Sequence, residues 1–539
     1  MRRHLLFAAA LLLAARAAEP IVAEGEDWSL PGWVQPKPYS GFYAMNSRAE
    51  HPLIKHLGMT LTWKALNPAE GVYDFSVLEK YLDLAQQRGG MVLFRLKASV
   101  LDGLEQGVTG GERQFIPPWV VAKHHPATFH TRPDKLYAAP WNPGVQSEYR
   151  KLVLEIGRRG YLASPQFLAI YLHGISKSHG EEMSVPDERY VREAMAAGLT
   201  ADVLLACWQA RMDAWAEAAG RFSGKVIWVG TAEFKGLPYP REELDAYARA
   251  KGFGLRGGFI EHYFYGHLAP PVAGQSYVDG HVVSDWSAPL RDGRYFGDEN
   301  EETDEFGDAK GRELDVAVRS PYFRAAQVGI NYLWVTRQTV EWAGGAKGIP
   351  GWFVNVAGKG PAESPDAACW LRETLVRGLG TPAPRPWKNL ERMLGQRDVP
   401  GARSVPTERY AMPYVSLKVR EDPGEFTARR TDRAGGQRAL AFALEPAFRA
   451  SLAGPVQIKV TYLDHAKTTW TVRSVSGGKL ADLGIVHGRG DGAWRTATFA
   501  TDEPPSAGAW GQGMDFAIHA LGDADVTVRF VRVVRLNER

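Results

Sequence analysis

Short apolar segments rich in β-formers alternate with amphipathic helical segments from about residue 38 to about residue 385. This alternation predicts βα units around a parallel sheet, because each helix must bury its apolar stripe against the sheet. In the clearest unit, Ser76 and Glu79 match a capping box, and Gly89 supplies a left-handed stop at the helix end. The same helix carries an apolar stripe of Leu78, Tyr81, Leu82 and Ala85.

Eight segments of this region have the composition of strands. They are SGFYAM (40–45), MTLTW (59–63), MVLFRLK (91–97), FLAIYLHGI (167–175), KVIWVGTAE (225–233), GGFIEHYFY (257–265), RYFGDEN (294–300) and INYLWVT (330–336). Eight parallel strands with intervening helices are what a closed (β/α)8 or TIM barrel requires, and we predict that α/β fold. An open doubly wound sheet is the alternative, but the glycine loop that normally follows its first strand is absent from the sequence.

The two ends of the chain differ from the barrel. Residues 1–18 have the charged, apolar and small-residue order of a secretory signal peptide, which predicts a secreted or periplasmic protein. The barrel is expected over residues 19–385 and a linker over 386–412, with the Pro-rich segment GLGTPAPRPWKN (378–389) marking the boundary. Residues 413–539 contain short alternating runs between turn residues, which predict an all-β sandwich.

The amino-acid composition limits the kinds of binding partner to be expected. The net charge of +3 gives no reason to expect nucleic acid or a membrane surface, and no later segment is long and apolar enough for membrane insertion. The 17 Trp and 20 Tyr fit a poly- or oligosaccharide partner, because flat aromatic faces stack on sugar rings, although large barrels also bury such residues as core. The oligomeric state is left open.

The two cysteines, Cys207 and Cys369, lie in segments predicted as helices, and we expect buried free thiols there. A single disulfide is the alternative. Neither cysteine has the spacing of a structural zinc site. We expect no metal in the catalytic site and no cofactor.

Acidic residues lie at three predicted strand ends, which in a barrel meet at one mouth. Glu181 and Glu182 follow the fourth strand, Glu299 ends the seventh, and Glu261 lies in the sixth. Glycosidic bond cleavage needs one protonated carboxyl group for the leaving oxygen and one ionised carboxylate to attack carbon or activate water. Strands four and seven lie on opposite sides of a barrel, so their acids can face each other across a sugar. A separation of roughly 5 Å favours retention, and one of roughly 6.5–9.5 Å favours inversion.

The segment WKALNPAEGVYDFSVLEKYLDLAQQRG, the acid after strand four, His262-Tyr263, Glu299 and Trp334 together resemble the clan A glycoside hydrolases. That clan includes β-galactosidases, cellulases and agarases, and the resemblance covers the barrel only. It implies that Glu181 is the acid/base and Glu299 the nucleophile. It further implies that Tyr263 donates a hydrogen bond to the nucleophile and that Trp334 forms the floor of the sugar site.

One position departs from the clan pattern. The clan usually has an Asn immediately before the acid/base residue, where this chain has Gly180. That Asn ordinarily binds the sugar 2-hydroxyl. Without it, the sequence does not clearly separate Glu181 from Glu182 as the acid/base residue. Glu181 is favoured because the Gly-Glu turn follows the fourth strand most directly. Glu261 is the alternative nucleophile. The remaining acids of the NEETDE segment fit a solvated loop or a calcium site.

Other side chains near the predicted mouth are candidates for substrate binding, each with a structural alternative. They are Trp63, Asn67, Arg95, His173, His179, His262, Tyr263 and Trp334. Arg95 resembles a basic residue that some clan members place under the nucleophile, and a structural ion pair is the alternative. Trp63 is either a subsite wall or core. In the sandwich, Trp470, Trp494 and Trp510 form either a glycan-stacking face or core and turn residues.

The sequence therefore predicts a secreted glycoside hydrolase that cleaves a poly- or oligosaccharide with two carboxylates by the retaining mechanism. A non-catalytic glycan-binding protein on a degenerate barrel is one alternative, motivated by Gly180. A polysaccharide lyase is another, motivated by the Tyr and His residues near the site.

Overall fold

The structure is a computed structural model. It describes residues 19–38, 40–45, 51–103, 112–172, 183–185, 187–228, 232–256, 275–278, 281–284, 296–299, 322–323, 325–326, 330–335, 337–371, 373–374, 390–407, 409–410, 425–426 and 428–538.

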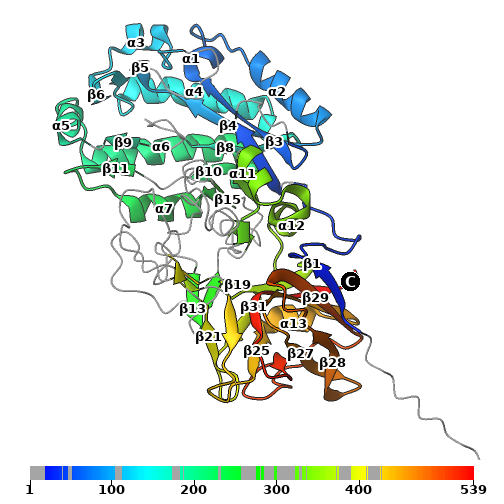
Figure 1. Cartoon of the computed structure of the whole chain (residues 1–539). Coiled ribbons are helices and arrows are strands. Elements are labelled where there is room, and N and C mark those ends of the chain that lie inside the picture. The colour runs from blue at the N-terminus through cyan, green and yellow to red at the C-terminus, as the bar shows by residue number, and fades with distance from the viewer. Residues whose placement is uncertain are drawn as a thin grey trace, which may run out of the picture.

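A curled parallel sheet organises the first part of the chain (Figure 1). Its strands are β2 (Gly41–Met45), β3 (Ile54–Thr62), β4 (Val92–Lys97), β8 (Phe167–Tyr171), β10 (Val226–Trp228), β12 (Gly254–Arg256), β15 (Phe296–Glu299) and β16 (Tyr332–Trp334). Each strand pairs in parallel with the next in this order, and β16 pairs with β2, so the hydrogen-bonded path closes on itself. Seven strands overlap the predicted segments. β12 lies directly before its predicted segment, 257–265, which is outside the described residues.

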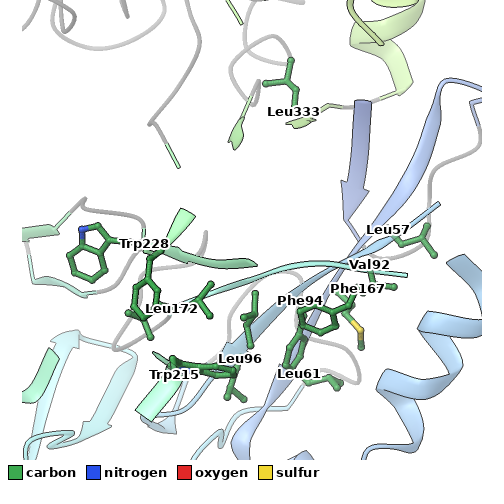
Figure 2. Packing of buried hydrophobic residues seen from close by; sticks show 14 of the residues in the cluster. Leu57, Leu61, Val92, Phe94, Leu96, Phe167, Leu172, Trp215, Trp228 and Leu333 are labelled. Carbon is green, nitrogen blue, oxygen red and sulfur yellow. The ribbon is translucent and has the colours of Figure 1, made fainter. Parts of the chain in front are cut away.

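Helices pack against the outer face of this sheet. The described helices of this part are α1 (Trp63–Leu66), α2 (Ser76–Gln87), α3 (Pro118–His124), α4 (Pro143–Arg158), α5 (Glu188–Ala196), α6 (Ala201–Ala219), α7 (Arg241–Ala250), α11 (Arg337–Trp342) and α12 (Ile349–Val356). Alternate strand residues such as Leu61 and Phe94 share one hydrophobic core with helix residues such as Trp215 (Figure 2). The mixed α/β architecture predicted from the sequence is therefore confirmed.

Helix α2 shows which local predictions are correct. Its residues Leu78, Leu82 and Ala85 are buried, and Gly89 has a φ of 63°. The capping box is wrong: the helix starts at Ser76, and Asp74 Oδ1 accepts a hydrogen bond from the Ser76 N–H at 2.9 Å. The side chain that makes this contact thus belongs to Asp74, two residues before the predicted cap residue Ser76.

His56 holds two backbone groups inside the parallel sheet. It is 3% exposed, its Nδ1 accepts a hydrogen bond from the Met91 N–H at 3.1 Å, and its Nε2 lies 3.1 Å from the Ser40 carbonyl oxygen. A neutral imidazole satisfies both contacts, since one ring nitrogen accepts and the other donates. Burial, assisted by the charge of Lys55, lowers the pKa of His56 to about 4 and outweighs the opposing contact with the Ser40 carbonyl.

Acid should therefore destabilise the fold through His56. Because the folded pKa lies below the unfolded value of about 6.5, the unfolded state binds the proton first, and stability falls as the pH drops from about 6.5 to about 4. The loss should reach about 3 kcal/mol. Urea unfolding at pH 7 and pH 4.5 measures it. The variant His56→Gln keeps a donor and an acceptor without the titration and should lose less. The exposed His465→Gln is the control and should behave as the wild type; equal losses in all three proteins would contradict the assignment.

Two antiparallel sheets form the C-terminal sandwich. The first contains β1 (Ile21–Glu24), β29 (Ala493–Thr501), β26 (Val456–Asp464), β31 (Thr527–Arg535), β17 (Asp366–Trp370), β19 (Leu390–Arg392), β21 (Ser404–Pro406) and β24 (Arg429–Thr431). The second contains β20 (Leu394–Arg397), β25 (Ala439–Leu444), β30 (Phe516–Ala520), β27 (Thr469–Ser476) and β28 (Lys479–His487). Their inner faces share one hydrophobic core, which includes Ile458 from the first sheet and Ile518 from the second.

The sandwich sheets also contain strands from segments that the sequence analysis assigned to the barrel and to the linker. β1 and β17 come from the segment predicted as the barrel, 19–385, and β19, β20 and β21 come from the predicted linker, 386–412. The helix predicted around Cys369 is wrong, because Cys369 lies in β17. Residues on both faces of this strand are buried, so it shows no alternation that would separate it from a helix. Both cysteines are buried and free, as expected.

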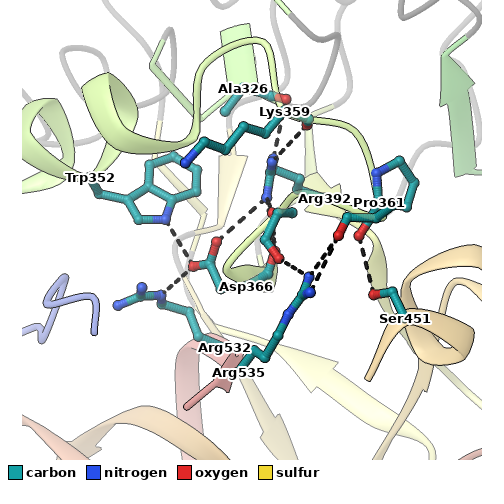
Figure 3. Close-up of polar contacts among 11 residues, drawn as sticks. Ala326, Trp352, Lys359, Pro361, Asp366, Arg392, Ser451, Arg532 and Arg535 are labelled. Carbon is teal, nitrogen blue, oxygen red and sulfur yellow. Dashed lines mark hydrogen bonds and ion pairs between the residues drawn. The ribbon is translucent and has the colours of Figure 1, made fainter. Parts of the chain in front are cut away.

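A buried polar cluster joins helix α12 to the sandwich (Figure 3). Asp366 is fully buried, and its Oδ2 accepts hydrogen bonds at 2.8 Å from Trp352 Nε1 and from Arg532 Nε. The guanidinium of Arg392 lies 3.5 Å from the other oxygen of the same carboxylate. Aromatic rings surround this contact: Trp28, Phe323, Trp352, Trp370 and Phe530 pack on one another. The barrel and the sandwich therefore share a continuous buried interface.

Candidate functional site

Aromatic side chains fill the interior of the curled sheet. The hydroxyl oxygens of Tyr43 on β2 and Tyr171 on β8 lie 3.0 Å apart, although β3 and β4 separate these two strands in the sheet. Only side chains that cross the interior can meet in this way. Tyr332 on β16 contacts the Tyr43 ring at 5.9 Å between ring centroids. The interior cluster comprises Tyr43, Met91, Leu93, Leu168, Ala169, Tyr171, Ile227 and Tyr332.

Two cations lie in the same interior near the carboxyl end of β4. Phe94 and Leu96 pack outward against the helices, so the alternate residues Arg95 and Lys97 face inward. Arg95 is 5% exposed and Lys97 is 4% exposed. The Arg95 guanidinium carbon lies 5.2 Å from the centroid of the Tyr171 ring. Buried positive charge at this end of the barrel favours the ionised form of carboxylates placed nearby.

The last residues of β15 and β16 meet at the carboxyl end of the sheet. Glu299 ends β15, and its backbone pairs in register with Trp334, which ends β16. Trp334 in turn pairs with Tyr43, is partly buried, and packs on the interior cluster. A tryptophan in this position presents an aromatic face at the mouth of the barrel. Glu299 is placed here by its backbone register alone.

The other predicted catalytic residues lie outside the described residues. Glu181 and Glu182 fall between Tyr171, the end of β8, and Met183, the start of β9 (Met183–Val185). β9 pairs in parallel with β11 (Ala232–Phe234), which follows the fifth barrel strand in the chain. The remaining candidates outside the description are His173, His179, Glu261, His262 and Tyr263.

Trp63 and Asn67 are wrong as subsite walls. Trp63 is fully buried in the core between sheet and helices, and its ring contacts Tyr149 at 5.6 Å. Asn67 is 2% exposed, and its Nδ2 donates to the carbonyl oxygens of Ala69 and Val72, both at 2.8 Å. Asn67 Oδ1 accepts a hydrogen bond from Trp63 Nε1 at 3.3 Å. Both residues therefore stabilise the turn after helix α1 rather than line the mouth.

The three sandwich tryptophans do not form one exposed face. Trp470 is fully buried and packs on Tyr462 and Phe499. Trp494 is covered by the Arg529 guanidinium, whose carbon lies 4.0 Å from the ring centroid. Trp510 is partly buried and packs against a small cluster that includes residues of β25 and β30, separate from the core that contains Trp470. The core alternative is therefore correct for Trp470.

The sequence did not reveal several residues of the barrel interior and of its mouth. Tyr43, Tyr171 and Tyr332 sit in three different predicted strands, and a shared inward direction appears only when the strands are placed in register. Lys97 was predicted to lie in a strand, but no role in the site was predicted for it. Glu112 lies in the loop after β5 (Val100–Asp102), and nothing in the sequence connects this loop to β3. In the described part of the chain, no three His, Cys, Asp or Glu side chains gather closely enough to hold a metal ion.

No protein-family model matches the chain, and no curated protein matches it. Among solved structures, the chain is similar to the catalytic domain of β-amylase from Paenibacillus polymyxa, with 11% identity, a TM-score of 0.34, and coverage of 59% of this chain and 97% of that one. It is similar to endo-glycoceramidase II from Rhodococcus sp., with 11% identity, a TM-score of 0.31, and coverage of 88% and 100%. It is also similar to a β-galactosidase from the haloarchaeon Halorubrum lacusprofundi, with 10% identity, a TM-score of 0.30, and coverage of 57% of this chain and 53% of that enzyme. These structural neighbours are glycoside hydrolases.

Proposed function

We propose that this chain is a glycoside hydrolase that cleaves O-glycosidic bonds of a poly- or oligosaccharide at the mouth of a (β/α)8 barrel. The observation that carries the proposal is the register of β15 and β16, which puts Glu299 at the end of the seventh barrel strand beside Trp334 on the eighth. Glu181 follows the fourth strand in the chain. Acids from strands four and seven can flank one glycosidic bond, because the carboxyl ends of all eight strands meet at one mouth.

In the proposed reaction, Glu299 attacks the anomeric carbon while the glycosidic C–O bond breaks and Glu181 gives its proton to the leaving oxygen. Glu181 then removes a proton from water, which hydrolyses the glycosyl ester and releases a sugar of retained configuration. Arg95 and Lys97 supply positive charge that favours the ionised form of the nucleophile. Trp334 supports the sugar ring.

The other predicted site residues are proposed as alternatives to the two catalytic acids or as substrate contacts. Glu182 is the alternative acid, and Glu261 is the alternative nucleophile. His173, His179, His262 and Tyr263 are proposed to contact the substrate or these acids. No cofactor takes part.

Export belongs to the same proposal and is supported by the sequence pattern of residues 1–18. Mass spectrometry of the secreted protein would detect a chain that starts after this segment; an uncleaved chain retained in the cell would contradict it. None of the described helices combines the length and the apolarity needed to cross a membrane.

Incubation with a panel of plant, algal and host polysaccharides tests the activity. The expected result is release of reducing sugar from at least one of them, with retained anomeric configuration by NMR. Products that absorb as unsaturated uronides would replace the proposal with a lyase. Tight binding without any product would replace it with a glycan-binding protein.

A further inference from the structure

Glu112 lies at the mouth of the barrel, although it is far from the predicted catalytic residues in the sequence. Its Oε2 accepts a hydrogen bond of 2.6 Å from Thr62 Oγ1. Thr62 is the last residue of β3, is 1% exposed, and pairs in register with Lys97. Leu61 packs outward against the helices, so Thr62 faces the interior. The Glu112 carboxylate therefore sits above the barrel interior, at the carboxyl ends of the second and third strands.

Backbone contacts of the residues that directly follow Glu112 hold this segment in place. The N–H of Gly103 donates to the carbonyl oxygen of Arg113 at 3.0 Å, and the N–H of Phe115 donates to that of Val100 at 2.8 Å. The N–H of Lys64 donates to the carbonyl oxygen of Phe115 at 2.7 Å. The segment is thus held between β5 and helix α1, which lie at the same end of the structure (Figure 1). A side chain held in this way loses little further freedom when it binds a ligand.

The carboxylate retains capacity to accept hydrogen bonds. Among the described residues, the Glu112 carboxylate accepts one hydrogen bond, from Thr62 Oγ1. The ammonium of Lys64 lies 3.9 Å from Oε1, beyond hydrogen-bond distance. The Glu112 side chain is 28% exposed. An ionised carboxylate offers about four acceptor positions and no donor. Its complement is a group with two adjacent O–H donors, which is what neighbouring hydroxyls of a sugar ring present.

We propose that Glu112 is a specificity-determining residue that binds two adjacent hydroxyls of one sugar unit at the mouth of the barrel. This inference rests on the proposed function, since it concerns the same mouth. Thr62 acts as a positioning residue, because its hydroxyl orients the carboxylate while its Oγ1 also accepts a hydrogen bond from the Ala65 N–H at 3.0 Å. Removing the negative charge should weaken sugar binding and leave the chemical step almost unchanged.

The test compares Glu112→Gln with the wild type on oligosaccharides of defined length made from the polysaccharide that the wild type degrades or binds. A hydrogen bond to a charged group corresponds to a change of about 10- to 100-fold in KM and in the dissociation constant measured by calorimetry. We expect a rise of this size, with kcat changed by less than about threefold. Thr62→Val should raise KM less, and Thr62→Ser should restore the wild-type value.

Glu217→Gln is the matched control, because Glu217 is an exposed carboxylate on helix α6 that pairs with Arg150 on the outer helical layer. This control should leave KM unchanged. An unchanged KM and affinity in Glu112→Gln, with an unchanged thermal midpoint, would overturn the inference while hydrolysis stands. Weakened binding without any hydrolysis by the wild type would overturn the proposed function and support this inference. A wild type that neither binds nor cleaves any glycan of the panel would overturn both.

Discussion

Glutamine in place of Glu299 should reduce the release of reducing sugar by at least about 10³-fold, because removal of a catalytic nucleophile leaves only binding and electrostatic contributions to the rate. Glu299 ends the seventh barrel strand beside Trp334, and glutamine keeps its shape while removing the attacking charge. Activity of the purified variant on the polysaccharide degraded by the wild type measures the loss.

The control for this variant is Glu301→Gln, two positions further along the same acidic segment, where we expect a solvated side chain. It should keep wild-type activity. Glu181→Gln and Glu182→Gln separate the two candidate acids, and the larger loss should fall on Glu181. If Glu299→Gln retains full activity and Glu261→Gln does not, Glu261 replaces Glu299 as the nucleophile.

Asparagine in place of Asp366 should lower the free energy of unfolding by about 3–5 kcal/mol, the usual cost of removing one partner from a buried ion pair. The carboxylate is fully buried and receives hydrogen bonds from Trp352 and Arg532, with Arg392 nearby (Figure 3). Asparagine retains one acceptor oxygen but leaves two buried guanidinium groups without their counter-charge. Urea unfolding measures the change.

Asp482→Asn is the matched control for this variant. Asp482 pairs with Arg473 at 2.7 Å, but both side chains are about one-third exposed, at 37% and 33%. Exposed ion pairs contribute less than about 1 kcal/mol, so the control should unfold close to the wild type. Equal losses in the two variants would mean that the interface around Asp366 does not depend on its charge.

Most of the parallel sheet was predictable from the sequence because several of its strands, such as β4 and β8, are short apolar segments. Some of the neighbouring helices also show a clear apolar stripe, as in α2. The strand β17 was not predictable from the sequence. Ala367 and Cys369 face the sandwich core while Trp370 faces the barrel, so neither face is polar and the alternation typical of a strand is missing. Strands of three or four residues in the predicted linker, such as β19 and β20, are too short to show a period.

The candidate site was predictable only where a residue ends a strand. Glu299 and Trp334 were predicted in this way, and each ends a barrel strand in the structure, while their roles in the site stay predictions. Trp63 also follows a strand, but the chain turns directly into helix α1 and buries the ring. Glu112 reaches β3 through contacts between a loop and a strand, and such tertiary contacts leave no periodic signal in the sequence.

The pairing of β1 with β29 has a consequence for how the chain reaches its native state. The Asp27 N–H, just after β1, donates to Thr496 Oγ1 across 469 sequence positions, so β1 is synthesised long before the strand with which it pairs. Contacts of such long range slow folding and prolong the exposure of apolar surface. Trp28 and Trp352 would remain uncovered during this interval and in any truncation that lacks the sandwich. We expect such truncations to aggregate rather than to yield an isolated barrel.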